Sequence, residues 1–180
     1  GSTCAEGCPL ENATPSCVGN ECSIESCESG WFDTDGVPEN GCECSEIGSD
    51  PGSSCQEAHY LGEFPDDGTS QTFRGILPWK NDADTVTFFA KDVFHWGADR
   101  YDVRISLASA DPSIRLCVYW HETGNHLSEC YLENENCPES RSFQRNGTNG
   151  GDDADYVVKI YREPGAAPTC RPYTLSVSNG

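Results

Sequence analysis

Carboxylate side chains crowd one short segment near the start of the chain, at a spacing that suits a hard cation. Asp33 and Asp35 stand two residues apart before a glycine, and Glu39 and Asn40 follow. Ca²⁺ prefers such oxygen ligands presented around a tight turn. Val37, however, occupies a ligand position of the twelve-residue calcium loop. The segment is therefore either a calcium site at Asp33 and Asp35 or a solvated acidic turn.

Aromatic side chains supply a second candidate for binding chemistry. Trp79 and Trp96 fall in expected loops, whereas Tyr119 and Tyr161 fall on the solvent-facing side of expected strands. Exposed flat rings stack on sugars and on extended peptides. These four residues are our candidate ligand contacts, and packing within loops is the alternative for the two tryptophans.

Catalytic signatures are missing from the sequence. It contains no Gly-x-Ser-x-Gly, no His-Glu-x-x-His and no glycine-rich phosphate loop. None of the four histidines stands in a recognisable motif. His121 and His126 either bind a metal or are exposed loop residues. We expect a protein that is not an enzyme, and scattered carboxylates leave a small secreted hydrolase as the alternative.

Twelve cysteines in 180 residues indicate disulfides and an oxidising compartment. No Cys-x-x-Cys spacing of a zinc knuckle or redox motif is present. We expect full pairing in a secreted or cell-surface protein, and proximity suggests Cys117 with Cys130 and Cys137 with Cys170. The set is Cys4, Cys8, Cys17, Cys22, Cys27, Cys42, Cys44, Cys55, Cys117, Cys130, Cys137 and Cys170.

Charge divides the chain into two parts. Residues 1–73 hold 15 Asp and Glu and no Lys or Arg, whereas all 11 basic residues lie in 74–180. The net charge of −19 argues against nucleic acid as a partner, because phosphate binding needs clustered basic side chains. No apolar run approaches the ~20 residues of a membrane span. We predict a cysteine-rich segment at 1–48 and a β-sandwich domain at 49–180, of unknown oligomeric state.

The two parts also differ in periodicity. Up to residue 44, turn-forming dipeptides punctuate a segment with few apolar residues, so we expect loops that disulfides constrain. Beyond residue 55, apolar and polar residues alternate with period two, which predicts about eight strands of a mainly antiparallel β-sandwich. The clear runs are 86–90, 101–107, 114–120, 156–161 and 173–178, and the weaker ones are 72–77, 126–132 and 141–144.

The segment Cys27-Glu28-Ser29-Gly30-Trp31-Phe32-Asp33-Thr34-Asp35-Gly36 is followed by Asn40-Gly41-Cys42-Glu43. This pattern resembles cysteine-rich segments of large secreted myxobacterial proteins, and the resemblance covers residues 4–44. There such segments act as spacers beside other domains. The resemblance therefore implies structure and location rather than an activity.

Short motifs follow one another in a fixed order between residues 55 and 179. They are Ala58-His59-Tyr60-Leu61-Gly62, Asn81-Asp82-Ala83-Asp84-Thr85-Val86-Thr87-Phe88, Asp155-Tyr156-Val157-Val158-Lys159-Ile160 and Tyr173-Thr174-Leu175-Ser176-Val177. This order resembles the bacterial pre-peptidase C-terminal domain. Asn81 and Thr85 depart from the glycine and the aromatic residue of that family. The resemblance implies a non-catalytic, jelly-roll-like β-sandwich appended to exported enzymes.

The same resemblance implies candidate calcium ligands, because some members of the family bind calcium through acidic residues. Asp82 and Asp84 match the family's Asp-x-Asp positions. Asp66 and Asp67 lie in an acidic loop before them and match no fixed motif. The alternative is that these carboxylates cap turns.

We therefore expect a non-catalytic accessory or binding module of an exported bacterial protein. Calcium is its one candidate cofactor, and an extracellular polymer, protein or polysaccharide is its expected partner. Gly1-Ser2 resembles a cloning remnant, so we expect the chain to be a fragment. The alternatives are the small hydrolase and a protease inhibitor built on the disulfide framework.

Overall fold

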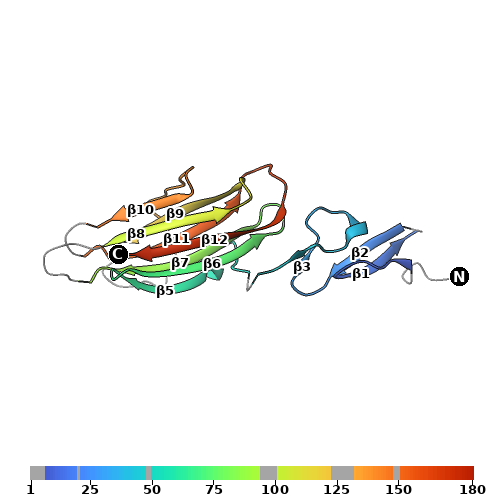
Figure 1. Cartoon of the computed structure of the whole chain (residues 1–180), viewed down its shortest axis with the longest axis horizontal. Helices are drawn as coiled ribbons and strands as arrows, with labels where there is room; N and C mark the ends of the chain where they lie inside the picture. Colours follow the sequence, from blue (N-terminus) through green and yellow to red (C-terminus); the bar gives the residue numbers. More distant parts are fainter. Residues whose placement is uncertain (1–6, 20, 48–49, 94–100, 123–131, 148–150) are drawn as a thin grey trace.

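The computed structural model describes all residues except 1–6, 20, 48–49, 94–100, 123–131 and 148–150. The described residues form strands and short 3₁₀ turns, with no α-helix among them. Figure 1 shows an elongated molecule of two parts, which we call the head (residues 7–47) and the body (residues 50–180). The predicted mainly β class is confirmed. No helix in the described part of the chain has the length and apolar character to cross a membrane.

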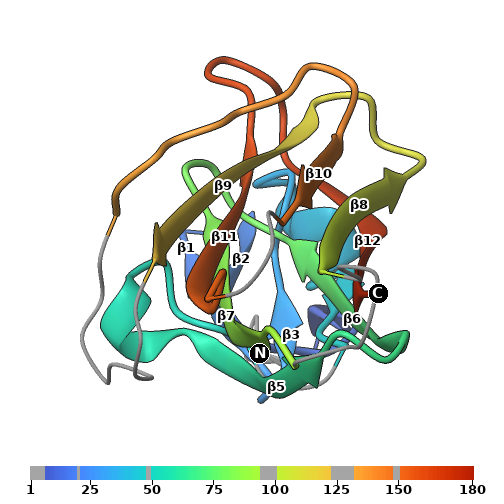
Figure 2. The same cartoon turned by 90° about the vertical axis from the view of Figure 1, so that its left-hand side faces the viewer.

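The body is a sandwich of two four-stranded sheets, seen end-on in Figure 2. The first sheet has the order β10 (Ser142–Asn146), β8 (Asp102–Ser109), β12 (Thr169–Asn179), β6 (Thr69–Leu77). The second has the order β5 (His59–Pro65), β7 (Ala83–Lys91), β11 (Ala154–Arg162), β9 (Ile114–Glu122).

Alternating side chains from both sheets meet in one core. In β8, Val103, Ile105 and Leu107 are buried while Arg104 between them is exposed, as the period of two requires. The strand pairs β7–β11, β9–β11 and β8–β12 are antiparallel, as we predicted. The pair β5–β7 is parallel, which we did not predict. The alternation therefore confirms the sandwich, and the jelly-roll connection stays a prediction.

The head contains more regular structure than we predicted. We expected loops, but β1 (Ala13–Val18) and β2 (Glu21–Cys27) form an antiparallel hairpin, and β3 (Trp31–Phe32) pairs with β4 (Cys44–Ser45). A 3₁₀ turn, η2 (Pro38–Asn40), lies between these pairs. No residue of the hairpin is fully buried, so its strands lack the apolar alternation that reveals strands in a sequence.

Disulfides hold the head in place of a core. Cys8 pairs with Cys22, and Cys27 pairs with Cys42. Cys17 is disulfide-bonded as well. Cys4 lies outside the described residues. Bridges of this kind restrict the unfolded chain, which a segment with little buried apolar surface needs.

Both pairings that proximity suggested are wrong. Cys117 of β9 pairs with Cys137. Asn136 exchanges two backbone hydrogen bonds with Val118, which places the segment before Cys137 alongside β9. Cys55 is also disulfide-bonded, and Cys130 lies outside the described residues.

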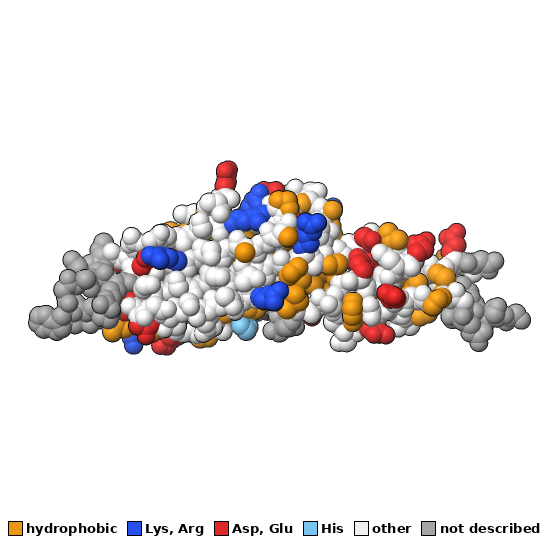
Figure 3. Space-filling view, in the orientation of Figure 1, with side chains coloured by type: hydrophobic (Ala, Val, Ile, Leu, Met, Phe, Trp, Pro, Cys, Tyr) orange, Lys and Arg blue, Asp and Glu red, His pale blue; other side chains and the backbone are white. Residues whose placement is uncertain are grey.

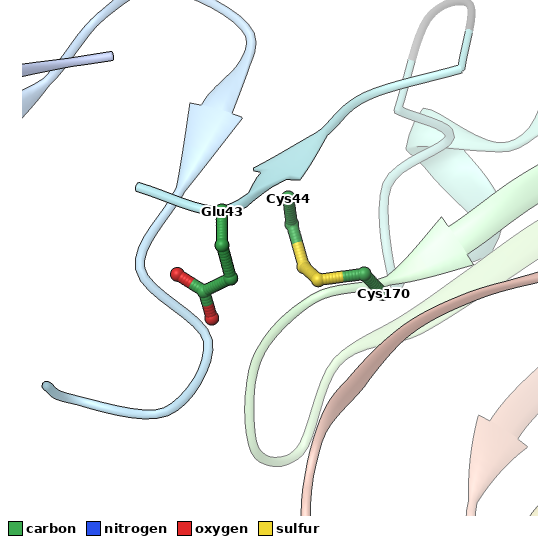
Figure 4. A group of neighbouring side chains, drawn as sticks. All are labelled: Glu43, Cys44 and Cys170. Atoms are coloured by element: carbon green, nitrogen blue, oxygen red, sulfur yellow. A yellow bond between two sulfur atoms is a disulfide. The ribbon is translucent and has the colours of Figure 1, made fainter. Parts of the chain in front are cut away.

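A further bridge ties the head to the body. Cys44 of β4 pairs with Cys170 of β12 across 126 residues of sequence, and Figure 4 shows Glu43 beside this bridge. Phe32 of the head packs edge to face on Trp79 of the body, with ring centroids 4.3 Å apart. In Figure 3, apolar side chains gather where the head meets the body. The two parts are therefore joined by a covalent bond and an aromatic contact as well as by the linker.

Candidate functional site

An acidic cluster lies where the linker from the head meets the body. Asp82 precedes β7, Asp84 lies within it, and Asp50 comes from the linker. One carboxylate oxygen from each residue lies within 4.8 Å of the others. The structure thus brings together Asp82 and Asp84, which sequence reasoning selected, and Asp50, which it missed.

Two carboxylate oxygens of this cluster are buried without a hydrogen-bond donor. Asp84 is 1% exposed, and its Oδ2 accepts a hydrogen bond from the Tyr173 hydroxyl. The other oxygen of Asp84, Oδ1, accepts no hydrogen bond. Asp82 is 9% exposed, and its Oδ2 accepts none either. A buried carboxylate oxygen without a donor destabilises a protein unless a proton or a cation accompanies it.

Local backbone structure explains how Asp50 reaches β7. The linker turns at a short 3₁₀ segment, η3 (Cys55–Glu57), and the Gly52 N–H donates to the Glu57 carbonyl at 3.1 Å. The Thr85 N–H donates to the Gly52 carbonyl at 3.2 Å, which fixes the linker against the strand. Asp50, two residues earlier, is thereby held beside Asp82 and Asp84.

Burial and mutual repulsion make these carboxyls weak acids. Burial raises the pKa of Asp84 to about 8, and the nearby carboxylates of Asp82 and Asp50 add to the increase. Burial likewise raises the pKa of Asp82 to about 6, with a further contribution from Asp50. Burial and the Asp50 charge also raise the pKa of Glu46. These carboxyls therefore tend to keep their protons, and a bound cation would favour their charged forms by replacing those protons.

The donor set suits a hard divalent cation. Three carboxylates offer only oxygen atoms, which Ca²⁺ prefers, and water completes a calcium coordination shell of six to eight oxygens in many proteins. The two donorless oxygens of Asp82 and Asp84 fit a bound cation, and a proton shared between Asp84 and Asp50 is the alternative.

The other predicted acidic residues do not join this cluster. Val93 donates its N–H to Oδ1 of buried Asp66 at 3.0 Å, and Thr69 donates its N–H to Oδ1 of Asp67 at 2.9 Å. Asp66 lies beside Gly180, just beyond the end of β12, whereas Asp84 contacts Tyr173 within that strand.

Asp33 and Asp35 form a separate group with Glu43 in the head. Gly36 donates its N–H to Asp33 Oδ1 at 2.7 Å, and Val37 donates its N–H to Asp35 Oδ1 at 2.9 Å. These carboxylates cap the turn that contains them, and the calcium site at Asp33 and Asp35 stays a prediction.

The three predicted aromatic residues that the structure describes come from separate elements. Trp79 is 40% exposed at the junction with the head. Tyr119 and Tyr161 lie half-buried on β9 and β11, and the Tyr119 hydroxyl donates to Glu135 at 2.8 Å. Trp96 and His126 lie outside the described residues, and His121 pairs with Glu133 at 2.8 Å.

Asp50 escaped sequence reasoning for a physical reason. It stands in a Gly-, Ser- and Asp-rich stretch that carries no periodicity and reads as a linker. The only available signal is a carboxylate close to Pro51, and such residues are common in solvated loops.

Comparison with known proteins places the chain in no family. No protein-family model matches it, and a search of curated proteins finds no match. Among solved structures, the chain is similar to Aeromonas hydrophila PliG, a periplasmic inhibitor of g-type lysozyme. The match has 12% identity and a TM-score of 0.38, and it covers 68% of this chain and 99% of that one. At this distance the likeness carries no argument about function, and the pre-peptidase C-terminal resemblance stays a prediction.

Proposed function

We propose that the chain is a non-catalytic, extracytoplasmic binding module with a calcium site at Asp50, Asp82 and Asp84. The observation that carries the proposal is that Asp82 and Asp84 each hold a buried oxygen without a donor, and that their carboxylates group with Asp50 within 4.8 Å. The disulfides support an extracytoplasmic location, since such bonds persist in oxidising compartments.

The place of the cluster suggests what the ion does. The small cavity beside Asp50 and Asp84 is lined by Phe32 and Ile47 of the head and by Ile76 of the body. A cation bound there would neutralise Asp50 against Asp84 and so hold the linker on the body. The ion would act as a structural clamp, and the partner of the module would be an extracellular protein or polymer that contacts the outer surface.

Thermal unfolding in calcium and in chelator tests the ion. Calcium at about a hundred times its Kd stabilises the native state by about 2.7 kcal/mol, which raises the Tm by about 5–10 °C. The Asp82→Asn/Asp84→Asn variant should lose this rise. The matched Asp33→Asn/Asp35→Asn variant, in the acidic turn of the head, should keep it.

Either of two outcomes would sink the calcium proposal. One is a Tm that does not depend on calcium in the unaltered protein. The other is a calcium-dependent rise that survives in Asp82→Asn/Asp84→Asn and disappears in Asp33→Asn/Asp35→Asn, because the ion would then bind in the head.

A further inference from the structure

A groove of about 270 Å³ lies on the outer face of the sheet β5-β7-β11-β9. Its volume is just below the about 300 Å³ at which small-ligand pockets begin. The floor of the groove consists of paired residues on neighbouring strands. Lys159 of β11 lies opposite Thr85 of β7, and Val157 of β11 lies opposite Tyr119 of β9. The linker around Ser53 and Leu132 form its rims.

One polar group in this groove has no partner. Thr85 is 2% exposed, and its hydroxyl makes no hydrogen bond. Its backbone N–H is already used by the Gly52 carbonyl, so only the side chain is unsatisfied. Buried hydroxyls normally make a hydrogen bond. A residue that lines a groove and whose buried hydroxyl makes none indicates that a ligand group is missing there.

The remaining groups of the groove define the chemistry of that ligand. Lys159 is half-buried and makes no ion pair with any described residue, so its ammonium is available to an anion. The Tyr119 ring lies beside Val157, and its hydroxyl bond to Glu135 fixes its position. Ser53 adds another hydroxyl at the rim. The groove thus offers one cation, hydroxyl partners and one aromatic face.

We propose that this groove binds a saccharide that carries a carboxylate, such as a uronic acid. The carboxylate pairs with Lys159, sugar hydroxyls bond to Thr85 and Ser53, and the apolar face of the ring packs on Tyr119. A neutral apolar ligand would leave Lys159 and Thr85 desolvated without partners. A simple anion would leave the aromatic face unused.

The groove is distinct from the calcium cluster, although β7 serves both. Asp84 faces inward to Tyr173, and Thr85, the next residue of the strand, faces the opposite side of the sheet. The saccharide proposal therefore does not depend on the ion.

Titration of the full chain with glucuronate, followed by calorimetry or amide chemical shifts, tests the proposal. Lys159→Gln should weaken binding about tenfold or more, as expected when a charged hydrogen bond is lost. Thr85→Val should also weaken binding, yet leave the Tm unchanged or higher without ligand, because it removes an unsatisfied buried hydroxyl. The control Lys91→Gln removes an exposed lysine at the end of β7 and should bind like the unaltered protein.

Acetate and glucose separate the two halves of the ligand. Glucose should bind at least tenfold more weakly than glucuronate because it lacks the charged hydrogen bond to Lys159. Acetate should bind at least tenfold more weakly because it lacks the sugar ring and its hydroxyls. Acetate that binds as tightly as glucuronate would show an anion site only, and glucose that does so would show that Lys159 has no role. Either result overturns the proposal, as does an absence of glucuronate binding or an equal loss in Lys91→Gln.

Discussion

Asp84 occupies an inward-facing position in β7 that an apolar residue would ordinarily fill. Val86 and Phe88, the next two inward residues of the strand, are at most 1% exposed in the core. A carboxylate in the same row lacks water to solvate its charge. The Tyr173 hydroxyl satisfies one oxygen, and the other needs a proton or a cation.

The pH dependence of stability should reveal this carboxyl when the metal is chelated. The pKa of Asp84 is raised to about 8 in the folded protein from an ordinary value of 3.8. Between these values the folded state holds a proton that the unfolded chain has released, so the unfolding free energy falls as pH rises. Urea unfolding in chelator at several pH values from about 4 to 8 measures this decrease.

A matched pair of variants isolates Asp84 from the general repulsion of an acidic protein. Asp84→Asn should reduce the fall of the unfolding free energy with pH. Glu25→Gln, which removes one exposed charge from β2, should leave that fall unchanged. If both variants keep the full slope, Asp84 does not titrate in this range.

Gly75 gives Tyr173 and Asp84 the space to approach each other. A Cβ at this position would lie 2.6 Å from the Tyr173 hydroxyl oxygen and 2.9 Å from Asp84 Oδ2. Gly75→Ala should therefore cost about 1–3 kcal/mol of unfolding free energy through overpacking. Chemical denaturation measures this cost, and Gly7→Ala, with open space around its Cβ, serves as the control. Equal stabilities of the two variants would contradict the crowding.

At the level of elements, one buried ion pair connects both sheets. Arg162 at the end of β11 bonds to Asp111 in the turn before β9, and its Nη2 donates to the Leu77 carbonyl of β6 at 2.9 Å. Thr169 of β12 donates to the same Asp111 carboxylate at 2.7 Å. Hydrogen bonds from Ser113, Thr169 and Arg162 outweigh the effect of burial and lower the pKa of Asp111.

Asp111→Ala should leave a buried arginine without its partner. Loss of one member of a buried pair costs about 3–5 kcal/mol, whereas an exposed pair contributes about 0–1 kcal/mol. Arg104→Ala, which breaks the exposed pair with Asp102, is the control. Urea unfolding of both variants measures the difference, and similar costs would argue against the role of Arg162 in joining the sheets.

The strands of the body could be predicted because half of their residues are buried. Period-two alternation located β8, β9, β11 and β12 within a few residues. It did not reveal β5, an edge strand that pairs in parallel across a register shift near Gly62. Alternation also cannot show which cysteines meet or that Asp50 reaches β7, because both depend on how separate segments pack. Two of the three carboxylates of the site, Asp82 and Asp84, could therefore be predicted from their motif, whereas Asp50 could not.

At the level of the whole molecule, the head and body should behave as one unit. The Cys44–Cys170 bond closes the junction that the Phe32 and Trp79 rings occupy. Replacing both cysteines, Cys44→Ser/Cys170→Ser, should let the head reorient independently while the core of the body stays folded. Amide ¹⁵N relaxation should then show a shorter correlation time for the head than for the body.

The bridge within the body provides the control for that experiment. Cys117→Ser/Cys137→Ser removes a disulfide of the same kind without touching the junction. It should leave a single correlation time for head and body. Independent motion in this variant as well, or in neither variant, would refute the coupling through Cys44 and Cys170.

The Cys44–Cys170 bond also decides how the molecule responds to mechanical force. A pull applied between the head and the C-terminal end runs along the chain to Cys44, crosses the two sulfur atoms and continues from Cys170. The chain between these two cysteines, which holds strands β5 to β11, lies outside this covalent path. Tension would therefore reach the C-terminal end without passing along these strands, whereas reduction of the Cys44–Cys170 bond would place them in the path of the load.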